Sequence, residues 1–269
     1  MNIVKRPLPL IGIALLVYLF LNPFYLFPDG QGYFSYLPSL FVDGDLHFYN
    51  EFTGMKIPVP IALTSTGYVS NIWSFGSAFF WTPFYLAARF FADVGTPPYN
   101  GWFWLWINFG TIVYGLLAYL LIGLMLKELK RDAHPWLIAA AAFIGTPMFF
   151  YTFSISCTAH GITAFAVTLF LWYWIHSFSY PWRPSRYVLL GLLAGLAAMV
   201  RPQEALFALA VIGELCVRTA KKEIKFSVAF RSAALFGAFF AAGLLPQLLI
   251  WKFIYGSFFA APAKFNVSL

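Results

Sequence analysis

The feature that most constrains this chain is a series of long apolar segments that carry almost no charge. A helix needs about 20 apolar residues to cross a hydrocarbon core of about 30 Å. Hydrophobic residues make up 61% of the sequence and charged residues 10%, whereas soluble domains carry about 25% charged residues. The sequence therefore predicts an all-α, polytopic integral membrane protein with a single transmembrane domain over residues 1–269 and spans at 8–27, 103–126, 135–153, 162–178 and 232–254.

Two shorter apolar arms, 187–200 and 205–217, flank the polar tetrad at 201–204 and predict a helical hairpin, which brings the expected number of transmembrane helices to about seven. Residues 28–102 form one long excursion that is expected to contain interfacial helices. Its aromatic, uncharged stretch 33–42 suits a helix along the membrane surface. The chain stops shortly after a span, so we expect a sequence truncated after residue 269.

The side of the membrane on which each loop lies can be inferred from the basic residues. Segment 74–94 is apolar but contains Pro83, Arg89 and Asp93. If it returns to its starting side and the N-terminus is inside, 12 of the 17 basic residues are cytoplasmic, against 6 if it crosses. The positive-inside rule favours the first arrangement. We therefore expect a bacterial inner (plasma) membrane protein with a cytoplasmic N-terminus and an extracytoplasmic active site.

The charge and the cysteines exclude other classes of protein. The net charge of +7 arises from basic residues in short loops between apolar segments, where they report topology and do not indicate nucleic-acid binding. Cys157 and Cys216 are far apart, each in or beside an apolar segment, so we expect no disulfide or cysteine-based metal framework.

An acidic run follows the first apolar segment. Four of the 10 acidic residues fall within 23 positions, at Asp29, Asp43, Asp45 and Glu51. Carboxylates gathered beside a membrane in an otherwise apolar chain favour a functional site. Pro28-Asp29-Gly30 is, alternatively, a set of turn-forming residues. The pair Asp43 and Asp45 can hold a divalent ion through carboxylate oxygens, or form a turn that closes the surface helix.

The order of several motifs resembles the GT-C membrane glycosyltransferases, most of all the protein O-mannosyltransferase and aminoarabinose-transferase group. The stretches that carry the resemblance are Asp29-x-x-x-Tyr33 with Gly44-Asp45-Leu46, Trp73-Ser74-Phe75-Gly76 with Trp81-Thr82-Pro83-Phe84, Thr146-Pro147 with Ala159-His160-Gly161, Gly195 to Pro202, and Leu245-Pro246-Gln247 with Tyr255-Gly256-Ser257. Two features differ from the group. Gly30 follows Asp29 where many relatives carry an Asp-Glu pair, and no acidic residue lies between Ser154 and Gly161.

The resemblance implies a polyprenyl-phosphate-linked sugar as donor, a lipid, glycan or protein as extracytoplasmic acceptor, and contact with membrane lipids. An acceptor hydroxyl or amine loses a proton as it attacks the sugar, so a carboxylate must lie within hydrogen-bond reach. Asp29 is the candidate for this catalytic role. Arg201 and His160 are candidates for binding the donor phosphate, and Asp43 and Asp45 are candidates for holding Mg²⁺ or Mn²⁺.

Arg201 lies at the tip of the predicted hairpin. Each arm of about 15 residues spans roughly 22 Å at a rise of ~1.5 Å per residue, short of the ~30 Å core. We therefore expect Arg201 below the outer membrane surface, where a cation needs an anion. That anion is either Glu204, three residues on, or the phosphate of the lipid donor.

Two other classes of function are open. A secondary transporter or lipid-linked-sugar flippase uses paired intramembrane charges such as Arg201 and Glu204, and many such proteins contain repeated halves. No internal repeat is visible in this sequence. A non-catalytic membrane scaffold is the third possibility.

Overall fold

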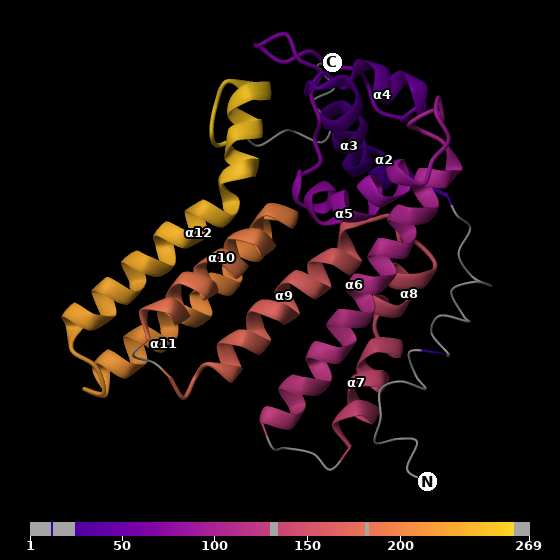
Figure 1. Ribbon diagram of the computed structural model, residues 1–269. Helices are drawn as coiled ribbons and strands as arrows, with labels where there is room; N and C mark the ends of the chain where they lie inside the picture. The colour runs from indigo at the N-terminus through magenta and orange to yellow at the C-terminus, as the bar shows by residue number, and fades with distance from the viewer. Residues whose placement is uncertain (1–11, 13–24, 130–133, 181–182, 261–269) are drawn as a thin grey trace.

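The computed structural model describes residues 12, 25–129, 134–180 and 183–260. Over these residues the chain is helical, with no β-strand beyond an isolated bridge between Leu63 and Val69. Figure 1 shows a bundle of long helices with short helices and loops at one end, which we call the cap (residues 28–100). The expected first span, 8–27, falls almost entirely outside the described residues.

The cap consists of short helices joined by loops. They are α2 (Pro28–Phe34), α3 (Tyr36–Pro38), the π-helical turn η2 (Ser39–Asp43), α4 (Tyr49–Gly54) and α5 (Gly76–Phe90). The stretch 33–42, expected as a surface helix, is helical but broken into consecutive pieces. Its residues Phe34, Tyr36 and Leu37 have no exposed surface. Much of this stretch therefore packs inside the cap, because its aromatic side chains find protein partners there.

The two turn-like motifs of the acidic run behave differently. Pro28 and Asp29 begin α2 and do not form a turn. Proline suits the first position of a helix, and an acidic residue in the first turn is stabilised by the helix dipole. Gly44, in contrast, has φ of 73° and ends η2, so Asp43-Gly44-Asp45 does form a turn.

The bundle follows the cap in the chain. Its elements are α6 (Gly101–Glu128), α7 (Pro135–Ile144), α8 (Pro147–Phe153), α9 (Ala159–His176), α10 (Pro184–Val200), the 3₁₀ turn η3 (Pro202–Phe207), α11 (Ala208–Ala220) and α12 (Phe226–Tyr255). The apolar segments of the sequence thus form helices near their expected positions.

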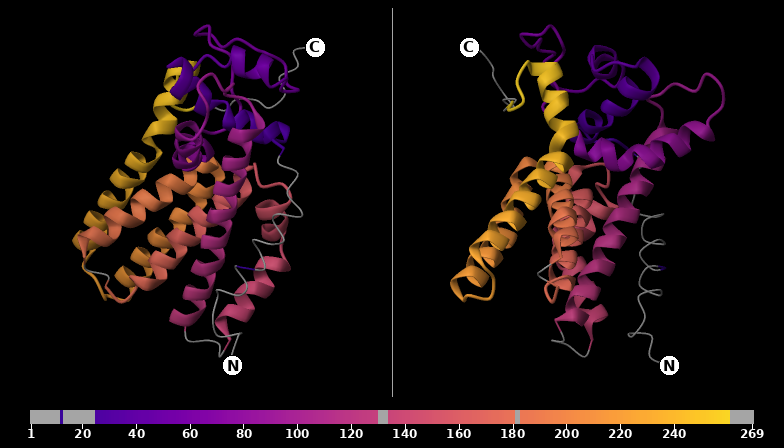
Figure 2. Two further views of the ribbon diagram at one scale, coloured as in Figure 1. Left: turned by 45° about the vertical axis from the view of Figure 1, so that its right-hand side comes forward. Right: turned by 60° about the vertical axis from the view of Figure 1, so that its left-hand side comes forward.

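Only some of these helices are long and apolar enough to cross a membrane. Among the described residues, α6 and α12 qualify singly, and α7 and α8 qualify together as one broken span. The 15-residue α5 contains Pro83 and is not a candidate span; it lies across the end of the bundle (Figure 2). These findings indicate a helical membrane protein, while the expected seven spans and their orientation stay predictions.

The span expected at 135–153 is a bent helix pair, which is either a broken span or a re-entrant loop. The chain bends by 74° between α7 and α8. Thr146, which precedes Pro147, is extended with φ of −120° and ψ of 167°, and its side chain caps α8 by accepting a hydrogen bond from the Met148 amide. A residue before proline is pushed out of the helical region, so the sequence Thr146-Pro147 ends one helix and starts another.

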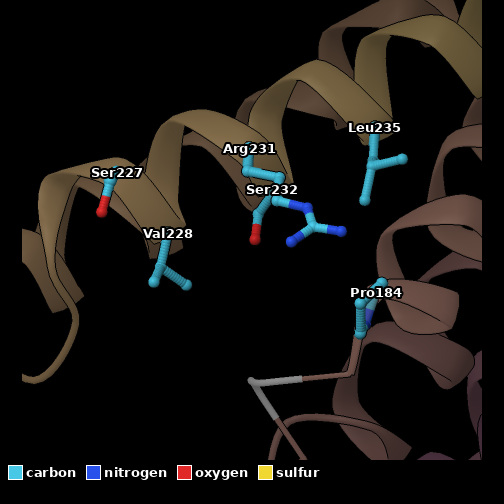
Figure 3. Close-up of a pocket in the computed structure, with 6 residues that line it drawn as sticks. All are labelled: Pro184, Ser227, Val228, Arg231, Ser232 and Leu235. Carbon is cyan, nitrogen blue, oxygen red and sulfur yellow. The ribbon is translucent and has the colours of Figure 1, made fainter.

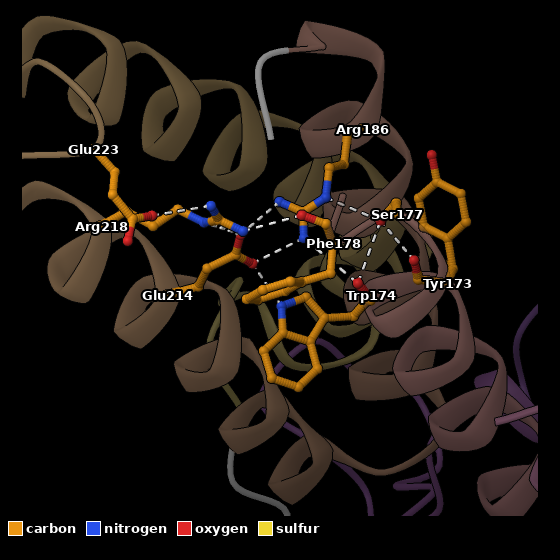
Figure 4. Close-up of polar contacts among 8 residues, drawn as sticks. All are labelled: Tyr173, Trp174, Ser177, Phe178, Arg186, Glu214, Arg218 and Glu223. Atoms are coloured by element: carbon orange, nitrogen blue, oxygen red, sulfur yellow. Dashed lines mark hydrogen bonds and ion pairs between the residues drawn. The ribbon is translucent and has the colours of Figure 1, made fainter. Parts of the chain in front are cut away.

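Arg186, in the first turn of α10, is a buried cation. The residue is 1% exposed, and its guanidinium binds both carboxylate oxygens of Glu214, at 3.1 and 2.8 Å. Arg218 also binds Glu214, through Nε at 2.8 Å. Figure 4 shows how this cluster joins the end of α9, the start of α10 and α11. A buried guanidinium needs an anionic partner, and Glu214 supplies it.

The cap is fixed to the bundle where α5 meets the end of α10. A Cβ atom at Gly76 would lie 2.3 Å from the Val200 amide nitrogen and 2.4 Å from the Met199 carbonyl oxygen. Only glycine permits this approach, which brings Trp73 and its neighbours close to the end of α10, where Arg201 follows.

Gly76→Ala should therefore lower the free energy of unfolding by about 1–3 kcal/mol, the usual cost of overpacking. The matched control is Gly213→Ala in α11, where no atom lies within 4 Å of the added Cβ. That change should raise stability by up to about 1 kcal/mol through helix propensity. Thermal unfolding of the two purified variants in detergent measures both effects. If Gly76→Ala and Gly213→Ala changed the free energy of unfolding equally, the close contact between Gly76 and the end of α10 would not limit the residue at position 76.

Candidate functional site

Asp29 lies in the first turn of α2 with its carboxylate exposed. Its Oδ1 accepts a hydrogen bond from the indole Nε1 of Trp73 at 3.0 Å. Trp73 itself is 4% exposed. A buried indole thus orients an exposed carboxylate.

Trp73 is held by hydrogen bonds at both its backbone groups. Its amide donates to Asn71 Oδ1 at 3.0 Å, and its carbonyl accepts from the Tyr36 hydroxyl at 2.7 Å. The Asn71 side chain also donates to the Gly32 carbonyl and to Ser35, at 3.1 and 3.0 Å. Because these partners are buried, the indole has little freedom to move away from Asp29.

Helix α12 supports the same loop from the bundle. The buried Gln247 accepts a hydrogen bond from the Phe75 amide at 2.6 Å, and the Tyr255 hydroxyl donates to the Asn71 carbonyl at 2.8 Å. The motif at 245–257 therefore positions the segment that orients Asp29.

Tyr33 lies between the acidic and the basic parts of the site. Its ring contacts the indoles of Trp73 and Trp81 edge-on, with centroids 6.4 Å apart in each pair. Burial raises the pKa of Tyr33 to about 12; the charge of Asp29 acts in the same direction and that of Arg201 in the opposite one. The hydroxyl therefore stays protonated at neutral pH, within electrostatic range of both residues.

Arg201 follows α10 and is partly buried. Its Nη1 lies 3.3 Å from His160 Nδ1, which accepts this contact if the ring proton is on Nε2. When the Gln203 amide presents its oxygen, that oxygen accepts from Arg201 Nη2 and Nε at 2.8 and 2.9 Å. Of the two anions considered for Arg201, Glu204 is not paired with it in the structure, since no such pair lies within 4.0 Å among the described residues. Burial raises the pKa of Glu204, and the charge of Arg201 partly offsets this shift.

His160 belongs to the first turn of α9 and stacks on Tyr151, with ring centroids 4.0 Å apart. The preceding loop touches α2, because a Cβ at Gly30 would lie 2.1 Å from the Cys157 carbonyl oxygen. Segments far apart in the sequence therefore meet here. The structure brings Asp29, His160 and Arg201 to one end of the bundle, with Tyr33 and Trp73 among them.

Asp43 and Asp45 do not join this group. Asp43 Oδ2 accepts from the Asn50 side chain at 2.7 Å, while Asp45 Oδ1 accepts from Ser39 Oγ and the His47 amide, each at 3.0 Å. Within the described ranges, no three His, Cys, Asp or Glu side chains are arranged to hold a metal ion. The two carboxylates close a turn, and Mg²⁺ or Mn²⁺ binding by them stays a prediction.

Glu51 is an unusual buried acid beside these two aspartates. It has no exposed surface, and neither carboxyl oxygen has a hydrogen-bond partner among the described residues. Burial raises the pKa of Glu51 to about 9, and the nearby Asp43 and Asp45 act in the same direction. At neutral pH the Glu51 carboxyl therefore stays protonated in the folded chain, whereas it is ionised in the unfolded chain.

This shift makes stability depend on pH. The folded pKa is raised, so unfolding becomes easier as pH rises from the usual Glu value of about 4.3 towards 9. Between about pH 5 and about pH 9 the protein should lose several kcal/mol of unfolding free energy, up to ~1.4 kcal/mol for each unit by which the pKa is raised. Glu51→Gln should flatten this slope, whereas Asp93→Asn, at an exposed carboxyl, should not. Denaturation curves across this pH range measure both, and an unchanged slope in Glu51→Gln would contradict the assignment.

Sequence reasoning named Asp29, His160 and Arg201 as candidates but did not identify the residues that contact them. Tyr33 and Trp73 appear in the motifs without an assigned role, and nothing in their spacing indicates that one would contact Asp29. Gln247 did carry a signal, because it is a lone polar residue beside Pro246 in an apolar segment.

Chemically, the site offers an exposed carboxylate for accepting a proton and a guanidinium with an imidazole for binding an anion. The chain matches no known protein-family model, no curated protein sequence and no solved structure.

Proposed function

We propose that this protein is a membrane glycosyltransferase of GT-C type that transfers a sugar from a polyprenyl-phosphate donor to an extracytoplasmic acceptor. The observation that carries the proposal is the exposed Asp29 carboxylate, oriented by a buried indole and gathered with Arg201 and His160 at one end of the bundle. The motif order of the sequence supplies the reaction class.

The proposed reaction begins when Asp29 accepts a proton from the acceptor hydroxyl or amine. The freed electron pair attacks the anomeric carbon of the donor sugar, and the bond from that carbon to the phosphate oxygen breaks. Polyprenyl phosphate leaves with the bonding electrons, and inversion at the anomeric carbon is expected by analogy. A general base contributes typically about 10²–10⁴-fold to such a step.

Arg201 is assigned to the donor phosphate. A guanidinium binds phosphate through two parallel hydrogen bonds, and His160 lies beside it as a second group that can contact the same anion. Because Arg201 makes no ion pair with Glu204, its charge is available to an incoming phosphate. This arrangement also gives less support to a transporter that depends on an Arg201–Glu204 pair.

The test uses the full chain in proteoliposomes made with total lipid extract from its source cells, which supplies the native donor and acceptor. Mass spectrometry should detect release of free polyprenyl phosphate as sugar is transferred. Arg201→Gln should raise the KM for the donor about tenfold or more, the effect of one lost charge-assisted contact. Movement of the labelled donor across the bilayer without release would indicate a flippase. If the donor is neither moved across the bilayer nor cleaved, the result would favour a non-catalytic scaffold.

Trp73→Phe tests how Asp29 is positioned. The ring is kept but the hydrogen bond to Asp29 Oδ1 is lost, so kcat should fall by about tenfold with little change in KM for the donor. Trp102→Phe is the matched control, because Trp102 also donates from its indole, to the Ala88 carbonyl at 2.9 Å, but lies away from Asp29. An equal loss of kcat in the two variants would mean that Trp73 acts only through packing and does not position Asp29.

A further inference from the structure

A cavity lies at the end of the bundle opposite the cap, between the start of α10 and the first turns of α12. Its volume is about 440 Å³, and it is lined by Pro184, Ser227, Val228, Arg231, Ser232 and Leu235 (Figure 3). Helix α12 has 30 residues and contacts the cap at Tyr255, so the cavity is roughly 30–42 Å along this helix from its contact with the cap, at a rise of ~1.5 Å per residue. It is therefore distinct from the site described above.

The cavity is lined by both polar and apolar side chains. Arg231 contributes a guanidinium and Ser227 and Ser232 contribute hydroxyls, while Val228 and Leu235 contribute apolar side chains. Arg231 forms no ion pair and no hydrogen bond with any residue that the structure describes, in contrast to Arg186 and Arg218, which share Glu214. The cavity thus presents an unpaired cation beside hydrogen-bonding groups, a combination suited to a phosphate.

The surroundings indicate where that phosphate comes from. Phe226 and Phe230 stack on each other next to the cavity, and they are 75% and 67% exposed. Large apolar side chains exposed on a helix that can cross a membrane face lipid. Arg231 directly precedes the apolar stretch 232–254, so it stands at the edge of the hydrocarbon, at the depth of phospholipid phosphates. The exposed Lys221, Lys222 and Lys225 in the preceding loop add positive charge at the same level.

We propose that this cavity binds the phosphate head group of one anionic phospholipid of the membrane leaflet opposite the cap. Arg231 pairs with the phosphate, Ser227 donates a hydrogen bond to one of its oxygens, and the acyl chains run along the apolar face of α12 past Leu235. The size of the cavity is in the range of small-molecule sites, and a soluble anion would leave its apolar lining unused. This inference does not depend on the glycosyltransferase proposal.

The test is native mass spectrometry of the full chain in detergent, titrated with phosphatidylglycerol and, separately, with phosphatidylcholine. Arg231→Gln should weaken binding of the first phosphatidylglycerol about tenfold, as expected for loss of one charge-assisted contact. Lys221→Gln removes the same charge from the same end of the bundle without touching the cavity, and should change binding by less than about twofold. Ser227→Phe keeps the charge but fills the cavity, and should also weaken binding.

Three results would overturn the proposal. One is an equal loss in Arg231→Gln and Lys221→Gln, which would mean diffuse charge attraction. The second is unchanged binding in Ser227→Phe. The third is displacement of phosphatidylglycerol by an equal concentration of inorganic phosphate, which would identify a soluble anion as the ligand.

Discussion

Asp29→Asn should lower the release of polyprenyl phosphate by about 10²–10⁴-fold, the usual contribution of a general base. The amide has nearly the shape of the carboxylate, and its oxygen can still accept the hydrogen bond from Trp73 Nε1. It cannot take the proton of the attacking hydroxyl or amine. Because Asp29 is exposed, the variant should fold and insert as the wild type does.

Asp93→Asn is the control for this experiment, since Asp93 is an exposed carboxylate of the cap beyond the end of α5. It should retain wild-type activity. Thermal unfolding and gel filtration establish that both variants are intact. If Asp29→Asn transfers sugar within about twofold of the wild-type rate, Asp29 is not the general base of the reaction.

The second large effect concerns stability. Glu214→Gln should lower the free energy of unfolding by about 3–5 kcal/mol, because it leaves buried guanidinium charge without an anion. Glu214 accepts from Arg186 Nη1 and Nη2 at 3.1 and 2.8 Å, from Arg218 Nε at 2.8 Å and from Trp174 Nε1 at 2.7 Å. The side chains of Arg186 and Glu214 are each 2% exposed. Because these contacts join α9, α10 and α11 (Figure 4), the variant should disturb the three helices together.

Glu223→Gln provides the comparison within the same network. Glu223 binds Arg218 Nη1 at 3.2 Å, but its side chain is 45% exposed, so its loss should cost about 0–1 kcal/mol. The double variant Arg186→Met with Glu214→Leu removes the buried charge pair, and should regain much of the loss seen in Glu214→Gln. Denaturation in detergent measures all three variants. Similar midpoints for Glu214→Gln and Glu223→Gln would show that the cluster is solvated.

Much of the helical structure could be predicted from hydrophobicity. The segments expected at 103–126 and 232–254 appear as α6 and α12, extended by a few residues at their ends. The hairpin arms appear as α10 and α11. The bend within segment 135–153 was not predicted, because a run of apolar residues does not reveal one, although Thr146-Pro147 carried the signal for it.

The candidate site was predictable only in part. The acidic Asp29 and the basic Arg201 stand out because charge is rare in this chain. Trp73 does not stand out among 10 tryptophans, nor Tyr33 among 15 tyrosines. Arg186 and Arg201 look alike in sequence, both in polar stretches beside apolar helices. Their difference depends on Glu214, 28 residues from Arg186 along the chain and on another helix.

The sequence by itself determined that this protein is helical, that some of its helices are apolar enough for a membrane, and that most of its few charges lie outside the long apolar segments. These properties follow from composition and from local hydrogen bonding. Only the tertiary structure decided which charges are satisfied and which are open: Arg186 is paired inside the bundle, Arg201 lies beside His160, and Arg231 lines a cavity. The physical reason is that burial and pairing depend on contacts between distant segments, such as Gly76 against Val200 and Gly30 against Cys157, which no local pattern encodes.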